Sequence, residues 1–469
     1  MRGGWWWGVV AGLPLMGCMS VGPNYEASRF MEEGVWAGPV GSGMEAMEPE
    51  LAWWEQFGDP LLTSYLERAR EENRDLQAAA ARVERARALR QGARSELGPR
   101  VDAEGGVSRR RSAAGQGDSS GGRYSTLFDA GLSASWEVDL FGGTRRANEA
   151  AQARLEGEME RYRATELALL AEVARSYYEV RGAQRRMANT RANIELQGRT
   201  YELVENLFLL GEASEFDLSR AKGQLQLTQS RLPELGANER AGIYRLSILV
   251  GLPPGALVEE MEVERGLPPV PDLIPLGQRS DVLRRRPDVR AAERSLAAAT
   301  ADIGSATADL FPRFSLLGTL GRSADTVDGL RDSLSTRGLA ASFVRWPVFQ
   351  SGQIRARIAA EKAEAKEAAA VYEQTVLAAL ADAEGALIRY LSQEETKVLL
   401  REVVASNERS FDLARRLFNA GEEGFLSVLD AERELIRAQD DLILSETEAV
   451  LRLIGLYTAL GGGWDVDGE

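Results

Sequence analysis

The side chains that could carry chemistry in this chain are carboxylates, guanidinium groups and one thiol. The 469 residues include no histidine and a single cysteine, Cys18, beside 71 acidic and 56 basic residues. These absences exclude histidine-based acid/base catalysis, zinc sites built from His and Cys, and disulfides within the chain. A carboxylate-based hydrolase is an alternative, because some carboxylates lie close together by chance, but no cleft-like constellation stands out. We therefore expect no enzymatic activity, no cofactor and no metal site.

Cys18 ends a stretch with the features of a secretory signal. Met1 and Arg2 precede an apolar run from Trp5 to Met16, which is too short to span a bilayer. Residues 15–18 resemble the bacterial lipobox, which implies removal of residues 1–17 and acylation of Cys18. Met19, in place of an aspartate, is compatible with sorting to the outer membrane. The alternative is a plain signal with an incidental cysteine. No other stretch is apolar over the 18 or more residues that a spanning helix needs.

The formal net charge of −15 argues against a nucleic-acid partner, because neutralising phosphates requires clustered Lys and Arg in excess. Basic runs at 109–111 and 284–286 are only three residues long. We interpret them as solvated or structural.

Two glycine-bearing turns, at Gly211 and Gly421, lie between very long helical patterns. Each is predicted to be the tip of a helical hairpin, because glycine suits the left-handed cap of one helix and Ser214 can cap the next. The helix that reaches the first tip would extend for about 100 Å. The return helices carry a seven-residue repeat, which indicates coiling of partner helices. Its positions are Leu218, Leu225, Leu232, Glu239 and Leu246 and, 210 residues later, Val428, Leu435, Leu442, Ala449 and Leu456.

The second half of the chain repeats the first at offsets of 210 to 213 residues. A helix is predicted over about 59–97, and alternating apolar residues then predict a β-hairpin over 101–138. A second β-hairpin is predicted over 313–346. Its apolar positions are Phe314, Leu316, Gly318 and Leu320, then Leu339, Ala341 and Phe343.

The expected organisation follows from these patterns. After the signal at 1–17 come an N-terminal arm (18–57), a first repeat (58–250), a Pro-rich linker (251–280), a second repeat (281–460) and an acidic tail (461–469). The fold class is α+β, mostly α, with long coiled helical hairpins and four transmembrane strands per chain.

Four membrane strands cannot form a closed wall, and an open sheet edge in lipid leaves backbone groups unpaired. Two copies of the chain would give eight strands, whose interior is filled by side chains, whereas three give twelve, which leave a lumen. We expect a homotrimer in which a 12-stranded β-barrel continues into a periplasmic α-helical barrel.

Several motifs have the order and spacing of a known family. They are VGPNY at 21–25, WWEQFGDPLL at 53–62, NRDLQAA at 73–79, LRRRPDVRAAE at 283–293 and the two glycine tips. The sequence resembles the TolC-like outer-membrane efflux factors, in the lipoprotein branch of OprM and NodT. This resemblance implies a trimeric outer-membrane exit duct that carries out no reaction. It also implies a periplasmic adaptor protein and an inner-membrane transporter, of the RND type, as partners, and small molecules as cargo.

The resemblance further implies roles for residues at the tips, which converge in the family to close the periplasmic end of the duct. By position, Leu426, Asp430, Phe418 and Asp217 match the gate, and Gly211, Ser214, Gly421 and Gly424 match the adaptor-docking surface. A carboxylate ring at a narrow neck attracts cations and makes closure costly unless something offsets the repulsion. Glu423 stands where some family members carry a basic gate residue, so closure would depend more on packing. Alternatively, Asp217 and Asp430 are simply helix N-terminal carboxylates favoured by the helix dipole.

Two other functions remain as alternatives. A duct for type I protein secretion shares the fold. A periplasmic coiled-coil scaffold without a pore would keep the alternating segments out of the membrane.

Overall fold

The computed structural model describes residues 20–26, 36, 44–45, 52–111, 124–263, 266–268, 274–276 and 279–462. Cys18, the expected signal, most of the N-terminal arm, residues 112–123 and residues 463–469 lie outside the described residues. The chain divides into two compact units. The first contains Met1–Ser28, Arg82–Met159 and Ala291–Glu373, and the second contains Arg29–Ala81, Glu160–Arg290 and Gln374–Glu469. Each unit therefore contains segments from both repeats.

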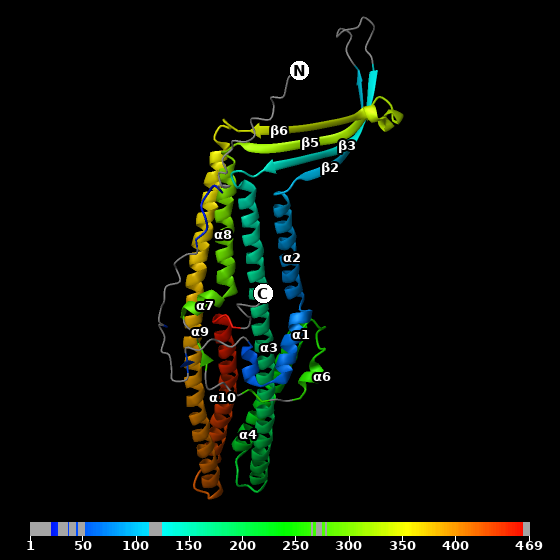
Figure 1. Cartoon of the computed structure of the whole chain (residues 1–469). Coiled ribbons are helices and arrows are strands. Elements are labelled where there is room, and N and C mark those ends of the chain that lie inside the picture. The colour runs from blue at the N-terminus through cyan, green and yellow to red at the C-terminus, as the bar shows by residue number, and fades with distance from the viewer. Residues whose placement is uncertain are drawn as a thin grey trace, which may run out of the picture. The chain divides into compact units, whose positions relative to one another are not determined.

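The first unit contains an antiparallel sheet of four strands in the order β2-β3-β5-β6 (Figure 1). The strands are β2 (Arg100–Arg111), β3 (Tyr124–Val138), β5 (Arg313–Ala324) and β6 (Thr336–Arg345). They lie in the two segments predicted to be β-hairpins. Two short 3-10 helices, Asp328–Arg331 and Ser333–Ser335, join β5 to β6. β2 and β6 are the edge strands, so each has one side without a pairing strand in the described chain.

The register divides the sheet into two chemically different faces, because residues paired across antiparallel strands point to the same side. Leu132 is opposite both Ala103 and Leu320, and Trp136 is opposite Leu316. We call this side the apolar face. Ser133 is opposite both Asp102 and Thr319, on the other side, which we call the polar face.

β6 does not follow the pattern of the other three strands. Leu339 is opposite Thr319 and Phe343 is opposite Ser315, so both side chains belong to the polar face. The alternating apolar residues of the second hairpin are therefore split between the two faces.

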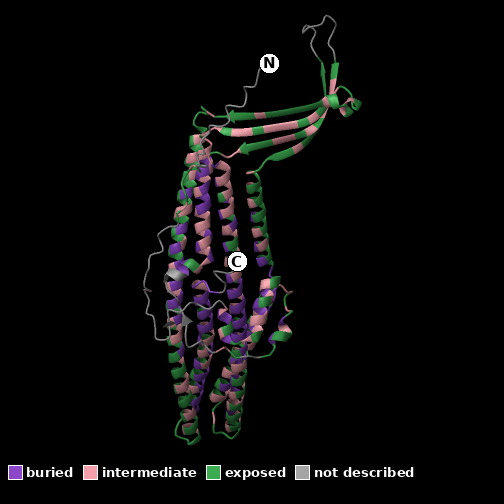
Figure 2. Cartoon of the chain, viewed as in Figure 1, coloured by how far each residue is buried: buried purple, intermediate pink, exposed green. Residues whose placement is uncertain are grey.

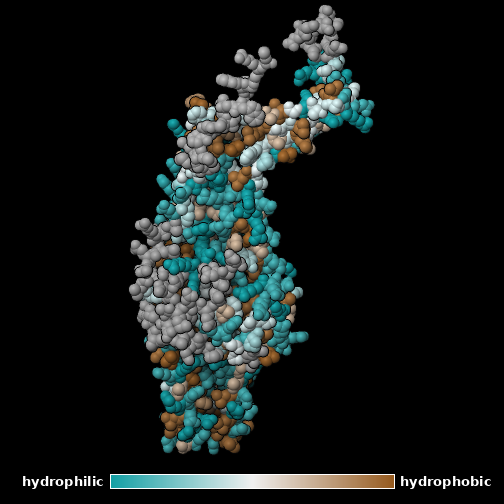
Figure 3. Space-filling model, in the orientation of Figure 1, coloured by the Kyte–Doolittle hydropathy of each residue, from teal (hydrophilic) through white to brown (hydrophobic). Residues whose placement is uncertain are grey.

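Both faces of the sheet are open in the described chain. No residue of these four strands is classed as buried (Figure 2). Hydrophobic surface lies along the strands in Figure 3. Leu132 and Leu320 are among the exposed hydrophobic side chains of the sheet. A sheet must normally bury its apolar face against another layer.

An equivalent tryptophan hydrogen bond occurs in both repeats, within the first unit. The indole Nε1 of Trp136, near the end of β3, donates to the backbone oxygen of Leu97 at 3.0 Å. The indole of Trp346, 210 residues later, donates to the oxygen of Leu310 at 3.1 Å. With Trp136 matched to Trp346, Asp129 and Ser133 match Leu339 and Phe343. The repeat therefore agrees with the register in placing the last two on the polar face.

Long helices form the remainder of both units (Figure 1). α3 (Gly143–Leu209) and α9 (Gln353–Asn419) contribute residues to each unit, and α8 (Pro287–Ala308) lies mostly in the first. The second unit contains α1 (Pro60–Glu72), α4 (Glu215–Gln229), α5 (Leu232–Leu249) and α10 (Phe425–Ala459). The shorter α6 (Val258–Met261), α7 (Arg279–Arg285) and the 3-10 helix Trp53–Phe57 belong to it, as does a parallel pair of two-residue strands, Met44–Glu45 and Ile274–Pro275.

The main core of the second unit is built around aromatic residues. Trp53 is fully buried and stacks on Tyr457 with ring centroids 5.6 Å apart. Tyr177 and Tyr178 pack edge to face beside them, together with leucines from α1, α3, α5 and α10. Such burial of large aromatic side chains is the main source of packing energy in a core. This core fixes the bases of the helical hairpins.

The expected helix over 59–97 is two helices, because Asn73 interrupts it. The side-chain Oδ1 of Asn73 accepts hydrogen bonds from the backbone N–H groups of Asp75 and Leu76, and so caps α2 (Arg74–Ser95). Its Nδ2 donates to the backbone oxygen of Leu249 at 2.9 Å. An asparagine that satisfies the first amides of a helix favours a helix start at that point.

The return helix of the first repeat is also interrupted. α4 ends at Gln229 and α5 begins at Leu232, with Pro233 in its first turn. Proline has no N–H to donate to the backbone oxygen four residues earlier, so the helix cannot continue through it. Ile443 stands at the matching position of the second repeat, where α10 is continuous.

None of the helices in the described parts of the chain combines the length and the apolar character required for crossing a membrane.

Candidate functional site

The first hairpin tip connects α3 to α4 in the second unit. Gly211 has a φ of +82°, a backbone conformation that glycine adopts without steric cost. The N–H of Glu212 returns to the oxygen of Leu207 at 2.8 Å and closes the end of α3. Ser214 then caps α4, and Asp217 completes a capping box by accepting from the Ser214 backbone at 3.2 Å. Asp217 therefore has a capping role at the start of α4.

The second tip connects α9 to α10 through a similar backbone path. Gly421 has a φ of +74°, and the N–H of Glu422 returns to the oxygen of Leu417 at 3.0 Å. Gly424 occupies the N-cap position and offers no side chain to cap α10. Glu423 accepts a hydrogen bond from the hydroxyl of Ser427 at 2.9 Å.

An apolar cluster joins the two hairpins close to the tips. Phe418 packs edge to face on Phe425, with centroids 5.6 Å apart. Phe418 is partly buried, whereas Leu426 remains exposed. The buried members come from all four hairpin helices and are Val204, Ala221, Phe411, Phe425, Val428, Leu429 and Leu435.

Asp430 lies between two guanidinium groups. Its Oδ1 is 3.8 Å from Nη2 of Arg220 on α4 and 3.6 Å from Nη2 of Arg433 on α10. Arg220 also lies over the ring of Phe216, 5.6 Å from its centroid. The sequence analysis noted Glu423 where some family members carry a basic gate residue, and it left open what offsets the repulsion at Asp430. In the structure Asp430 has one arginine beside it on each of the two hairpins.

Sequence reasoning missed Arg220, although a signal was present. Arg220 and Asp430 stand 210 residues apart, the same offset that relates Gly211 to Gly421. Opposite charges at matching positions of two repeats predict a pair wherever the repeats meet side by side.

A second residue that the sequence analysis missed is Glu432, which is almost completely buried beside the apolar cluster. Burial raises the pKa of its carboxyl to about 7, and a hydrogen bond from Thr200 acts in the opposite direction. Its position three residues before Leu435 and three after Leu429, both buried, is the signal that could have identified it.

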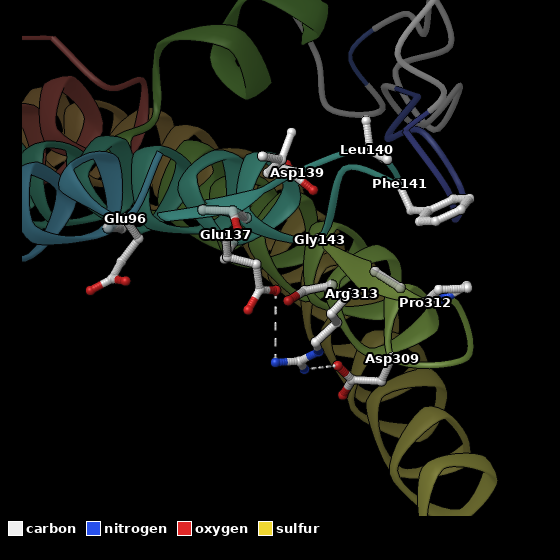
Figure 4. Close-up of a pocket in the computed structure, with 15 residues that line it drawn as sticks. Glu96, Glu137, Asp139, Leu140, Phe141, Gly143, Asp309, Pro312 and Arg313 are labelled. Atoms are coloured by element: carbon white, nitrogen blue, oxygen red, sulfur yellow. Dashed lines mark hydrogen bonds and ion pairs between the residues drawn. The ribbon is translucent and has the colours of Figure 1, made fainter. Parts of the chain in front are cut away.

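A separate cavity in the first unit, of about 310 Å³, lies where the strands meet the helices (Figure 4). Arg313, at the start of β5, pairs with Glu137 at 3.9 Å and with Asp309. Arg357 also binds Asp309, at 2.7 Å. These ion pairs connect the ends of β3 and β5 to α8 and α9, which indicates a positioning role.

The residues that follow Cys18 are held beside the end of β3, within the first unit. The N–H of Val21 donates to the oxygen of Phe141 at 3.0 Å. Arg146 donates to the oxygen of Val21 and to Oδ1 of Asn24, and the hydroxyl of Tyr25 donates to Glu293 at 2.8 Å.

Comparison with known proteins identifies the kind of molecule that this is. Residues 65–246 and 279–462 match the family described as outer membrane efflux protein. The pyoverdine export outer membrane protein OpmQ of Pseudomonas putida is 34% identical over 442 residues, 92% of each chain. Nodulation protein T of Rhizobium leguminosarum bv. trifolii is 31% identical and covers 97% of this chain and 96% of its own.

Solved structures of outer-membrane channels have the same fold as this chain. The outer-membrane channel OprN superimposes with a TM-score of 0.90 at 35% identity, over 95% of this chain and 99% of that one. The open state of the MtrE outer membrane channel of Neisseria gonorrhoeae gives a TM-score of 0.83 at 27% identity, over 95% of this chain and 98% of that one. The chain thus belongs to the outer membrane efflux protein family, and it is an outer-membrane efflux channel, a duct and not an enzyme.

Proposed function

We propose that three copies of the chain form one duct, with a 12-stranded β-barrel in the outer membrane that continues into a helical barrel in the periplasm. The support is the sheet of the first unit, which has four strands, two edges without partners and no buried residue among its described strands. Joining β6 of one copy to β2 of the next would satisfy both edges. It would also leave the apolar face for lipid and the polar face for a water-filled lumen.

The cargo proposed for the duct is small organic molecules. Relatives are named for the export of pyoverdine, solvents and antibiotics. The energy would come from an inner-membrane transporter, of the RND type. Relatives named as outer membrane proteins of efflux pumps support a pump as partner.

A periplasmic adaptor protein would dock at the two tips, around Gly211, Ser214, Gly421 and Gly424. Leu209 and Leu210, just before the first turn, are 75% and 73% exposed. Large apolar side chains with such exposure are typical of a surface that a partner covers. The apolar face of an adaptor helix is the proposed occupant.

The tips also form the proposed gate, with Leu426, Asp430, Phe418 and Asp217 near the constriction. The observation that carries this proposal is the contact between hairpins: Arg220 faces Asp430 across the tip, above a shared apolar cluster. Such a contact either stays packed or separates as a whole, which is what a gate requires. Asp217, because it completes a cap, would act by fixing the shape of the first tip.

Cys18 is the proposed lipid-attachment site. Val21 is hydrogen-bonded to Phe141, three residues beyond the end of β3. An acyl chain on a residue so close in sequence would therefore start near the end of the strands, where the membrane surface is expected.

Planar-bilayer conductance of the purified protein tests the duct and its gate together. Wild type should conduct weakly, and Asp430→Ala should raise the conductance and reduce cation preference. Asp441→Ala, which removes an exposed carboxylate farther along α10, is the matched control and should behave like wild type. A purified protein that gives no channels in any variant would argue against a duct. Equal conductance in wild type and Asp430→Ala would reject only the gate.

A further inference from the structure

Glu432 is an acid in an apolar setting. It lies on α10 near the second tip and is 1% exposed. Its neighbours along the helix, Val428, Leu429 and Leu435, are buried members of the cluster that joins the two hairpins. The matching residue of the first repeat is Lys222, which is exposed, so the feature exists in only one hairpin.

The hydrogen bonding around Glu432 suits a neutral acid better than a carboxylate. Its Oε1 accepts from the hydroxyl of Thr200 on α3 at 3.1 Å. That hydroxyl is also 3.3 Å from the backbone oxygen of Leu196, so its single proton is shared between two acceptors. Oε2 has no hydrogen-bond partner among the described residues. A carboxylate buried with so few donors loses solvation that nothing replaces.

A further polar group nearby has no partner either. Gln197, one helical turn before Thr200 on α3, is 2% exposed, and neither of its side-chain polar atoms forms a hydrogen bond in the described structure. α3 and α10 therefore each carry a buried polar side chain whose hydrogen-bonding capacity is not satisfied in the described structure.

No charged side chain in the described structure compensates Glu432. The charged residues on the four surrounding helices pair with other groups or remain exposed. On α3, Arg199 pairs with Glu195, and Glu205 accepts from Tyr201. On α4, Arg220 faces Asp430, and Lys222 is exposed. On α9, Asp412 pairs with Arg416, and Glu408 is exposed. On α10, Asp430, Arg433 and Glu434 pair among themselves or with Arg220.

We propose that Glu432 is a proton-binding site that couples the packing of the two hairpins to pH. The hairpins pack closely while the acid is neutral, and they separate when it ionises. A separated tip admits water to the carboxylate and frees Thr200 and Gln197 to bond with solvent. In the proposed duct, on which this consequence rests, the periplasmic end would therefore open more readily as the pH rises.

The direction of the pH effect follows from the uptake of a proton when the hairpins pack. The pKa of Glu432 rises from its ordinary value of 4.5 to about 7 when the hairpins pack, so the packed state binds more protons between these values. Packing is then fully favourable below pH 4.5 and weakens as the pH rises toward 7. Over that window the ratio of packed to separated tips falls by up to roughly two orders of magnitude per chain.

Hydrogen exchange of the intact membrane-extracted protein at pH 5.5 and 7.5, corrected for the intrinsic rates, tests the coupling without relying on transport. In wild type, amides over 196–205 and 425–436 should be at least tenfold more protected at the lower pH. In Glu432→Gln the same amides should be protected at both pH values. Glu434→Gln, which neutralises an exposed acid two residues away, should keep the wild-type difference. Thr200→Val should move the midpoint to higher pH, because it removes the one donor that lowers the pKa.

Conductance measured over the same pH range separates this proposal from the proposed function. Wild-type conductance should rise with pH, and Glu432→Gln should stay low throughout. A pH-dependent exchange pattern without any conductance change supports the proton site and removes its role in gating. Retention of the full pH dependence in Glu432→Gln, or its loss in Glu434→Gln, overturns the proposal.

Discussion

Arg220 and Asp430 occupy the same position in the two repeats of the chain, and their side chains face each other at 3.8 Å. One is basic and the other acidic. The two repeats have therefore diverged at this position, and the two residues now form a complementary pair. Three copies arranged around an axis would alternate three guanidinium groups with three carboxylates. Such a ring offsets the repulsion that carboxylates alone would create at a narrow neck.

The Arg220–Asp430 pair should contribute little to the free energy of gate closure in each chain, but a trimer would contain three such pairs. Both side chains are partly exposed, and pairs of this kind are worth about 0–1 kcal/mol. We expect Arg220→Ala and Asp430→Ala each to raise the open probability about two- to fivefold. The double variant should show less than the product of the two effects. A double-mutant cycle on bilayer conductance measures this coupling.

Arg433 supplies the control for that cycle. It also binds Asp430, at 3.6 Å, but it lies three residues away on the same helix. Its loss removes a charge of the same sign without removing a contact between hairpins. Arg433→Ala should therefore leave the open probability close to wild type, and an effect as large as that of Arg220→Ala would contradict the bridging role.

The hairpins, the strands and the repeat can be predicted from sequence because each depends on local patterns. The turn at Gly211 needs a left-handed residue, and the heptad from Leu218 onward needs a partner helix. The predicted helices are wrong where a residue that starts or ends a helix was overlooked. Asn73 caps a new helix within the expected one, and Pro233 ends α4 although the heptad continues through it.

Contacts between segments far apart in sequence are harder to predict. The pairing of Arg220 with Asp430 and the burial of Glu432 both depend on which faces of four helices meet. The period of a single helix does not contain that information. Likewise, the alternation in β6 predicts a strand, but only the register with β5 shows that Leu339 and Phe343 belong to the polar face.

The glycines of the second tip should differ in their tolerance to substitution. Gly421 has a φ of +74°, and a side chain there costs roughly 1–2 kcal/mol, whereas Gly424 has an extended backbone with open space around it. Gly421→Ala should increase hydrogen exchange over 417–430 several-fold. Gly424→Ser, which copies Ser214 of the first tip, should leave it unchanged or slow it. Equal effects of both changes would show that the turn does not depend on the left-handed residue.

Acylation of Cys18 and insertion of the strands should be separable. Cys18→Ser should abolish incorporation of radiolabelled palmitate, and the protein should still be recovered as an outer-membrane trimer, because the strands themselves provide insertion. Substitution of Tyr25 by Phe, which removes its hydrogen bond to Glu293 but keeps the cysteine, is the control and should be labelled normally. Labelling that persists in Cys18→Ser would place the lipid elsewhere.

The two faces of the sheet should respond differently to a charge, even at equal exposure. Leu132 is 53% exposed and Leu339 is 54% exposed, and they lie in neighbouring rows of the sheet but on opposite faces. In the proposed barrel Leu132 would face lipid, where an arginine near the midplane costs about 2–4 kcal/mol per chain. Leu339 would face the lumen, where an arginine stays hydrated. Leu132→Arg should therefore lose the heat-resistant trimer on gels, and Leu339→Arg should keep it and shift ion selectivity toward anions. If Leu339→Arg were the more damaging change, β6 would have to present its odd-numbered residues to lipid, and the register with β5 would differ by one residue in the assembled duct.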